Sequence, residues 1–318
     1  MMTPAEITDG LMSSILNGSP PWLRANRMFL SLSLDAHVEE SGYDERSKHL
    51  VFCALVAPKD DWKPFATKWW RVLCSPKVLR KGKRGRIYYK SSEADNRIPG
   101  GCFEGFTDAE MRKKVNELTV VITQNFVDGY GLCVSVPRRE FFEIVKRHNP
   151  VVSGNLKRYL DDPYYLAFQL VIDGVLTLET SQRGIVGQRI DFWLDDAGNL
   201  TERCRKIYNA VKATFQHQRS PLADIMGNCL PVDDTEILPL QAADLIASRY
   251  RKWKGQTIFE PYSSFTTLLR RRSIFGRDFT AQDLESYIDG LNSRIGELST
   301  EIITKFLDSL TKESDENR

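Results

Sequence analysis

The sequence predicts an α/β fold in which a mixed β-sheet is flanked by helices and followed by a C-terminal helical extension. Two observations lead to this prediction. Apolar segments of strand length alternate along the chain with segments in which apolar residues recur at the period of a helix. This order is typical of α/β proteins. The first two strand-like segments are separated by a short glycine-containing turn, which indicates a hairpin within the sheet.

Length and composition indicate a globular protein. The 318 residues suit one large α/β domain, which we place at 28–258, with an N-terminal helix and linker at 1–27 and the helical extension at 259–318. The six cysteines never form a C-x-x-C pair, which argues against a zinc site or disulfide scaffold and favours reduced thiols in a cytoplasmic protein. No apolar run has the length of a membrane span, and no signal-peptide layout opens the chain, so we expect no membrane association.

Each expected element of the first half has a local signal. Capping boxes that begin at Thr3 and Thr107 mark the starts of two helices. Strict alternation predicts the first strand, and a nearly continuous apolar run predicts a second strand that is covered on both faces. The expected elements are, in order, a short helix from Thr3, strands over 28–42 and 49–57, helices over 60–73 and 107–126, and a strand over 131–137.

The second half continues the same alternation of helices and strands. Pro163 is well placed at the first position of an apolar helix, because its missing N–H needs no partner there. The elements expected here are a helix over 163–179, a strand over 190–194, a helix over 201–216, a short strand over 224–229 and a helix that opens at 238.

The C-terminal extension carries apolar residues at alternating steps of four and three. They are Leu284, Ile288, Leu291, Ile295, Leu298 and Ile302. This spacing predicts a helix with a narrow apolar seam, weakened by two glycines. The seam either packs on its own domain or forms a homodimer through 281–310.

The strand over 28–42 becomes acidic as it ends. Its polar face is made, in order, by Ser31, Ser33, Asp35, His37 and Glu39. Carboxylates held side by side repel each other, and a divalent metal is the commonest cation that compensates them. The strand therefore indicates a metal-dependent enzyme. His37 is expected to be a satisfied polar residue rather than a ligand, and Glu40 a turn residue on the apolar side.

Two further carboxylates follow the same logic. Asp195 comes directly after the strand over 190–194, again before a glycine turn, and Asp244 lies on the inward stripe of the helix that opens at 238. A buried charge is costly unless it is paired or ligated. Carboxylates from strand ends and a facing helix would form an all-oxygen cage that suits Mg²⁺ or Mn²⁺. Two such ions about 4 Å apart cleave phosphodiesters through a metal-activated water.

These aspartates also have plainer interpretations. Asp196 is expected to cap the turn or the helix that follows it, and Asp195 has either that role or the role of a ligand. Asp244 has an alternative partner in an arginine such as Arg249 or Arg251.

Three segments together resemble a known pattern. The run EESG at 39–42, with the strand at 51–57 after it, is similar to an opening D-E-S-G motif; FWLD at 192–195 is similar to an internal acidic strand end; and LPLQAADLIA at 238–247 is similar to a closing L-Q-x-A-D-L-I motif. These motifs belong to a large bacterial family known only as domain-of-unknown-function family 3800. The resemblance spans roughly residues 28–253.

The resemblance implies a ribonuclease-H-like fold and a metal-dependent nuclease, often associated with mobile elements or phage defence. Carried over residue by residue, it gives Glu39, Asp195 and Asp244 as the motif carboxylates. Glu39 stands where the family usually has Asp, so Asp35, on the same face of the strand, is a rival for the ligand. Glu93 is a candidate fourth carboxylate.

A basic segment precedes Glu93. Its seven cations fall within fourteen residues that include no acid: Lys77, Arg80, Lys81, Lys83, Arg84, Arg86 and Lys90. Such a segment is suited to follow the phosphate backbone of DNA or RNA while Tyr88 or Tyr89 stacks on a base. The plainer alternative is a solvated loop.

The sequence thus predicts a Mg²⁺- or Mn²⁺-dependent nuclease that uses Asp35, Glu39, Asp195 and Asp244, with Glu93 as a further candidate ligand. The alternative from a different class is a non-catalytic subunit of a defence system that binds nucleic acid or protein without metal. A serine hydrolase and a phosphate-loop enzyme are not supported, because the chain has neither a G-x-S-x-G elbow nor Walker spacing.

Overall fold

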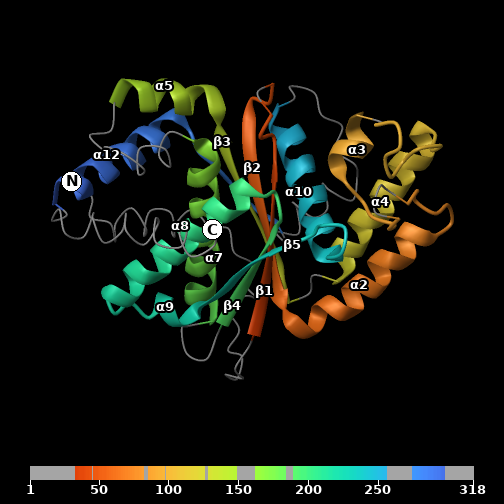
Figure 1. Ribbon diagram of the computed structural model, residues 1–318, viewed down its shortest axis with the longest axis horizontal. Coiled ribbons are helices and arrows are strands. Elements are labelled where there is room, and N and C mark those ends of the chain that lie inside the picture. The colour runs from red at the N-terminus through yellow and green to blue at the C-terminus, as the bar shows by residue number, and fades with distance from the viewer. Residues whose placement is uncertain are drawn as a thin grey trace, which may run out of the picture.

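A computed structural model of the chain describes residues 33–44, 46–81, 85–96, 98–125, 128–148, 162–183, 189–255 and 274–297. These residues form a six-stranded sheet with helices on both faces (Figure 1). The helix expected from Thr3, the beginning of the first expected strand and the chain after residue 297 lie outside the described residues.

The sheet is mixed, and its strands follow the order β5-β4-β1-β2-β3-β6. Strand β2 runs antiparallel to both β1 and β3, whereas β4 is parallel to β1, β5 to β4 and β6 to β3. The predicted hairpin and the predicted mixed α/β sheet of ribonuclease-H-like type are therefore confirmed. The strands are β1 (Ser33–Ser41), β2 (His49–Pro58), β3 (Tyr130–Pro137), β4 (Arg189–Asp195), β5 (Met226–Val232) and β6 (Ile274–Asp278).

Helices cover both faces of the sheet and enclose two apolar cores (Figure 1). One face carries α2 (Lys59–Cys74), α3 (Ser91–Asn96), α4 (Asp108–Asn125) and α10 (Leu238–Gly255). The other face carries α5 (Arg138–His148), α7 (Pro163–Arg183), α8 (Asn199–His217), α9 (Leu222–Ile225) and α12 (Ala281–Glu297).

Strand β1 lies in the middle of the sheet and is buried on both faces. Leu34, Ala36 and Val38 belong to the core beneath α7. The alternate side chains, Asp35 and Glu39 among them, point to the face that carries α10 and are also buried. The predicted alternation is thus correct, and its polar row is enclosed rather than exposed to solvent.

Local signals gave most of the boundaries. The capping box before α4 is formed, because Glu110 N–H donates to Thr107 Oγ1 (3.3 Å) and Thr107 N–H donates to Glu110 Oε2 (2.8 Å). The strand expected over 224–229 begins later than predicted, since residues 222–225 form the short helix α9 after Pro221 and β5 starts at Met226. Helices α3 and α5 and the edge strand β6 were not expected.

The described part of the C-terminal extension packs on its own domain. Leu284 and Ile288 of α12 are buried in the same core as the α7 face of the sheet. The homodimer through 281–310 stays a prediction, because most of the apolar seam lies outside the residues whose side chains are described.

The six cysteines are free thiols, as predicted. Within the described ranges, we find no helix whose length and apolar character would let it cross a membrane.

Candidate metal centre

Parallel pairing brings three chain segments together at one edge of the sheet. Val38 of β1 is the partner of Leu194 of β4, so the next residues along the two strands, Glu39 and Asp195, end up side by side. Asp195 in turn is the partner of Val232 at the end of β5, and the chain continues from there to Asp234. Carboxyl ends of parallel strands meet at one edge, so the three acids converge.

Glu39, Asp195 and Asp234 form a compact carboxylate cluster. One carboxylate oxygen from each lies within 4.8 Å of the others. Glu39 and Asp234 are buried, and Asp195 is partly exposed. Among the described residues, Oε1 of Glu39 is buried without a hydrogen-bond partner. An unpartnered oxygen on a buried carboxylate that is grouped with two others suits a cation site.

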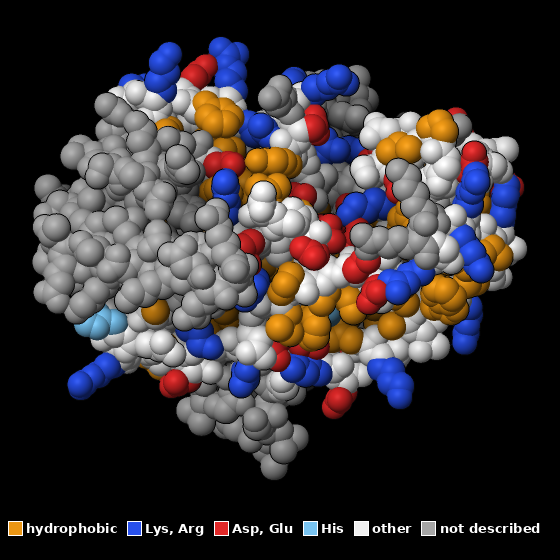
Figure 2. Space-filling view, viewed as in Figure 1, with side chains coloured by type: hydrophobic (Ala, Val, Ile, Leu, Met, Phe, Trp, Pro, Cys, Tyr) orange, Lys and Arg blue, Asp and Glu red, His pale blue; other side chains and the backbone are white. Residues whose placement is uncertain are grey.

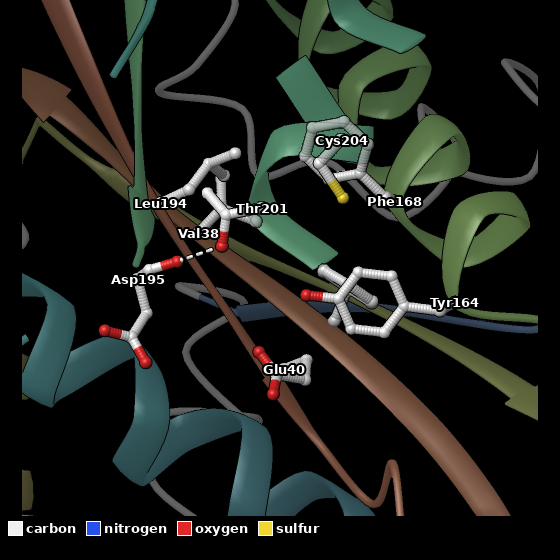
Figure 3. A pocket seen from close by; sticks show the side chains of 9 residues that line it. Val38, Glu40, Tyr164, Phe168, Leu194, Asp195, Thr201 and Cys204 are labelled. Carbon is white, nitrogen blue, oxygen red and sulfur yellow. Dashed lines mark hydrogen bonds between the residues drawn. The ribbon is translucent and has the colours of Figure 1, made fainter. Parts of the chain in front are cut away.

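Asp195 is held in place through its backbone. Thr201 at the start of α8 donates its hydroxyl to the Asp195 carbonyl (2.6 Å), as Figure 3 shows, and accepts a hydrogen bond from Ala197 N–H (2.8 Å). Asp196 N–H donates to the Val232 carbonyl at 2.8 Å. The side chain of Asp196 accepts a hydrogen bond from Gly198 N–H (3.2 Å), so its predicted role in the turn is confirmed. These contacts orient the backbone of Asp195, and its carboxylate faces the cluster, where Oδ1 accepts a hydrogen bond from Asp234 N–H (3.3 Å).

Asp244 of α10 is a neighbour of the cluster. Its side chain is 6 % exposed, and Oδ2 accepts a hydrogen bond from Ser91 N–H (2.7 Å). It lies close enough to Glu39 to contribute to the raised pKa of that carboxyl group. Of the two arginines considered as its partner, Arg251 donates to the hydroxyl groups of Ser41 and Ser47. The structure thus brings together Glu39, Asp195 and Asp244.

Lys90 is the cation that faces this cluster. Its Nζ forms ion pairs with Oδ2 of Asp234 and with Oδ2 of Asp195, the latter at 3.4 Å. Figure 2 shows acidic and basic side chains side by side near the centre of the face seen, next to β5 and α10. The sequence had assigned Lys90 to a phosphate-binding loop, but the fold turns it towards the acids.

Burial and mutual repulsion change the proton affinity of these groups. Burial raises the pKa of Glu39 well above its usual range and the pKa of Asp244 to about 7, although Lys90 lowers both. Burial lowers the pKa of Lys90, but the carboxylates of Glu39, Asp244, Asp234 and Asp195 outweigh it and raise that pKa overall. Lys90 is therefore charged at neutral pH, and Glu39 and Asp244 hold their protons more tightly than ordinary carboxyl groups do.

Asp35 lies away from the cluster, which corrects the expectation that it competes with Glu39 for the same ion. The two residues share a face of β1 but are four positions apart, which is roughly 13 Å along a strand. Asp35 is the partner of Asp191 on β4, and Lys59 lies between the two, with Nζ 2.6 Å from Asp191 Oδ2 and 3.6 Å from Asp35 Oδ1. The alternation of side chains along β1 places Asp35 and Glu39 on the same face, so the sequence could not separate them. The pairing of β1 with β4 does, because it gives Asp35 the partner Asp191.

His37 occupies the interval between the two groups of acids. Its ring packs edge-on against Trp62, with centroids 4.6 Å apart, and stacks at 6.0 Å on Trp193. Burial lowers the pKa of His37 to about 3, so the ring is neutral. Its Nδ1 has no hydrogen-bond partner among the described residues, so the expectation that it is a satisfied polar residue is wrong for that atom.

Glu93 also lies outside the cluster. Its two oxygens accept hydrogen bonds from Tyr88 Oη (2.6 Å) and Cys102 N–H (2.8 Å), so it links the segment before α3 to the segment after it. Tyr88 and Tyr89 are both buried. Neither tyrosine is therefore available to stack on a base, which corrects that expectation.

The basic segment is largely neutralised by acids from elsewhere in the chain. Lys77 pairs with Glu110 (2.9 Å), Arg80 with Glu104 and Arg86 with Glu236. Lys81 is exposed, whereas Lys83 and Arg84 lie outside the described residues. The absence of acids within the segment could not reveal these partners, because they come from distant positions.

Asp234 is the member of the cluster that sequence reasoning missed. The available signal was the pair Asp233-Asp234 just after an apolar strand, the same pattern that identified Asp195-Asp196. The expected strand over 224–229 ended too early to bring that pair to its end. Because β5 extends to Val232, Asp234 follows the end of a parallel strand, just as Glu39 and Asp195 lie near the ends of β1 and β4.

Glu40 points to the opposite face of the sheet from Glu39. It lies within β1 rather than in a turn, and its carboxyl group lines a small cavity with Tyr164, Cys204 and Asp195 (Figure 3). Burial raises the pKa of Glu40, Lys90 lowers it and Asp195 raises it. A fifth carboxyl group therefore adds to the negative field of the cluster from behind.

The donor set suits a hard divalent cation. All three members of the cluster offer carboxylate oxygens, the ligands that Mg²⁺ and Mn²⁺ prefer, and the described part of the cluster includes no histidine or thiol. Opposite ligands of a six-coordinate Mg²⁺ are about 4.2 Å apart, so oxygens within 4.8 Å of one another surround one ion after a small adjustment. The residues present therefore fit such an ion.

Comparison with known proteins adds no further guide to this site. No family model matches the chain, and no curated protein was found to be similar to it.

Proposed function

We propose that this protein is a Mg²⁺- or Mn²⁺-dependent nuclease that hydrolyses phosphodiester bonds in DNA or RNA. The observation that carries this proposal is the convergence of Glu39, Asp195 and Asp234 at the carboxyl edge of a ribonuclease-H-like sheet, with a buried Glu39 oxygen that lacks a described partner. We include three further statements in this proposal: membership of domain-of-unknown-function family 3800, a cytoplasmic location, and a role in phage defence or mobile-element biology.

Each residue of the centre has a distinct task in this proposal. Glu39, Asp195 and Asp234 would hold the ion, which when bound activates a water and neutralises charge on the phosphate. Asp244 adds negative charge from α10 and accepts a hydrogen bond from Ser91, so it ties the helix to the centre. The buried position of Glu39 keeps bulk water from weakening its attraction for a cation.

A cleavage assay with matched variants tests the proposal. Purified protein is incubated with labelled single-stranded DNA, duplex DNA, RNA and a hybrid duplex in the presence of Mn²⁺ or EDTA. We expect Asp195→Asn to reduce the cleavage rate by at least about 100-fold, because even residues that only orient a metal ligand are worth 10- to 100-fold. Asp35→Asn is the control, since it changes the same residue type at the far end of the paired strands.

The outcomes separate the proposed function from its alternatives. Equal cleavage by wild type and Asp195→Asn would refute the assignment of the centre. Cleavage of bis-p-nitrophenyl phosphate without cleavage of any nucleic acid would indicate a phosphoesterase for small substrates. Nucleic-acid binding that ignores EDTA, without cleavage, would indicate the non-catalytic defence subunit.

A further inference from the structure

Lys90 is positioned by the scaffold rather than by chance contact of a flexible side chain. The residues on both sides of it are anchored to α10, because Tyr89 N–H donates to Gln241 Oε1 (3.1 Å) and Ser91 N–H donates to Asp244 Oδ2 (2.7 Å). Gln241 is 1 % exposed, and its Nε2 donates to the Asp234 carbonyl (3.0 Å). The buried side-chain amide of Gln241 thus fixes the positions of the backbone next to Lys90 and of the backbone of Asp234.

The ammonium group of Lys90 already lies within the carboxylate cluster. Its Nζ contacts one oxygen of Asp234 and one oxygen of Asp195, two of the three candidate ligands. In two-ion centres the ions lie about 4 Å apart, so a second ion here would draw on the same three carboxylates. While Lys90 stays in place, its ammonium group already engages one oxygen of Asp195 and one oxygen of Asp234.

Charge leads to the same conclusion. Glu39, Asp195, Asp234 and Asp244 together carry four negative charges when ionised, and Lys90 supplies one positive charge within the group. One divalent ion leaves a net charge of minus one, whereas a second ion makes the group positive beside a buried ammonium. Repulsion between cations a few ångströms apart is strong away from bulk water.

We propose that Lys90 is a built-in cation of the carboxylate centre that limits it to a single divalent ion. The inference rests on the proposed function, because it assumes that the centre holds a metal. It specifies that function as hydrolysis with one ion and one lysine in place of the two-ion arrangement. Lys90 is thereby a positioning residue for the metal and not a loop residue for nucleic acid.

Mn²⁺ binding measured without substrate tests the proposal. Free Mn²⁺ is followed by electron paramagnetic resonance during titration of wild type, Lys90→Met and Lys90→Arg at neutral pH. We expect one bound ion for wild type and Lys90→Arg. We expect two for Lys90→Met, with the first ion bound about tenfold more tightly or better because an adjacent positive charge is gone. Frozen samples add a signature, since two ions in one centre give a spin-coupled spectrum and a single ion does not.

Lys59→Met is the matched control. Lys59 also bridges two aspartates, Asp35 and Asp191, at the opposite ends of the same pair of strands. Its loss removes an equal charge without touching the cluster, so binding stoichiometry and affinity should stay at the wild-type values.

The results distinguish this inference from the proposed function. Two coupled ions in wild type, or a Lys90→Met protein that binds one ion with unchanged affinity, would overturn the role of Lys90 and leave the metal-dependent function standing. Wild type that binds no Mn²⁺ overturns both. If Lys90→Met does not fold, the spectra of wild type and Lys90→Arg at saturating Mn²⁺ still decide, because a coupled pair in either refutes the inference and an isolated ion in both supports it.

Discussion

The raised pKa of Asp244 predicts that Asp244→Asn makes the metal-free protein more stable at alkaline pH than wild type. Asp244 is 6 % exposed, and burial raises its pKa from 3.8 to about 7. Its contribution to stability is therefore fully present below the ordinary pKa near 4 and is lost as pH rises through 7. From about pH 5 to about pH 8, this loss amounts to roughly 3 kcal/mol.

Asparagine removes the loss because it does not ionise. It keeps nearly the same shape, and its carbonyl oxygen can still accept the hydrogen bond from Ser91 N–H. The free energy of unfolding of Asp244→Asn, relative to wild type, should therefore rise by roughly 3 kcal/mol between the same two pH values. Titrating residues that do not interact with Asp244, such as His37, whose low pKa comes from burial, cancel in this difference.

Urea denaturation in EDTA, followed by tryptophan fluorescence, measures this difference at each pH. Asp191→Asn is the control, since interactions with Lys59 and Asn228 outweigh burial and lower the pKa of Asp191. A depressed carboxyl pKa affects stability only below about pH 4, so this variant should run parallel to wild type over the range tested. Mn²⁺ should flatten the wild-type profile, because the ion favours the ionised cluster.

Parallel profiles for wild type and Asp244→Asn would refute the reasoning. They would mean that Asp244 is ionised throughout the range and that the positive charge of Lys90 already compensates its burial.

Two further predictions concern stability. Gly42 has a φ of +92°, and a Cβ there would lie 2.3 Å from the His49 carbonyl, so Gly42→Ala should lower the free energy of unfolding by about 2 kcal/mol or more in urea denaturation. Gly100→Ala is its control, because that position has a φ of +81° but open space around it; an equal loss in both variants would contradict the proposed clash. Leu284→Ala in α12 should cost about 3 kcal/mol, since the side chain is fully buried in the core. The loss should not depend on protein concentration, and a concentration-dependent midpoint would instead show that Leu284 packs on a second copy.

The fold could be predicted largely from local patterns. Alternation along β1 correctly separated the side chains of its two faces, and a capping box located the start of α4. Helices α3 and α5 and strand β6 were not predicted from the sequence. Short or edge elements owe their stability to packing against neighbours rather than to their own sequence.

The site could be predicted only in part. Glu39, Asp195 and Asp244 were found because each acid sits next to an apolar strand or on the inward face of a helix. Asp234 was missed because the end of β5 was placed too early. Lys77, Arg80 and Arg86 looked like free cations, yet their acidic partners lie between 24 and 150 residues away along the chain.

The sequence by itself determined which residues share a face and where carboxylates follow strands, because side-chain direction in a strand alternates with a period of two. That same period made Asp35 and Glu39 equivalent. Only the tertiary structure decided between them, since parallel pairing of β1 with β4 and of β4 with β5 gathers Glu39, Asp195 and Asp234 at one edge and leaves Asp35 with Asp191 at the other. It also decided that Lys90 faces these acids, because α10 anchors the residues on both sides of it.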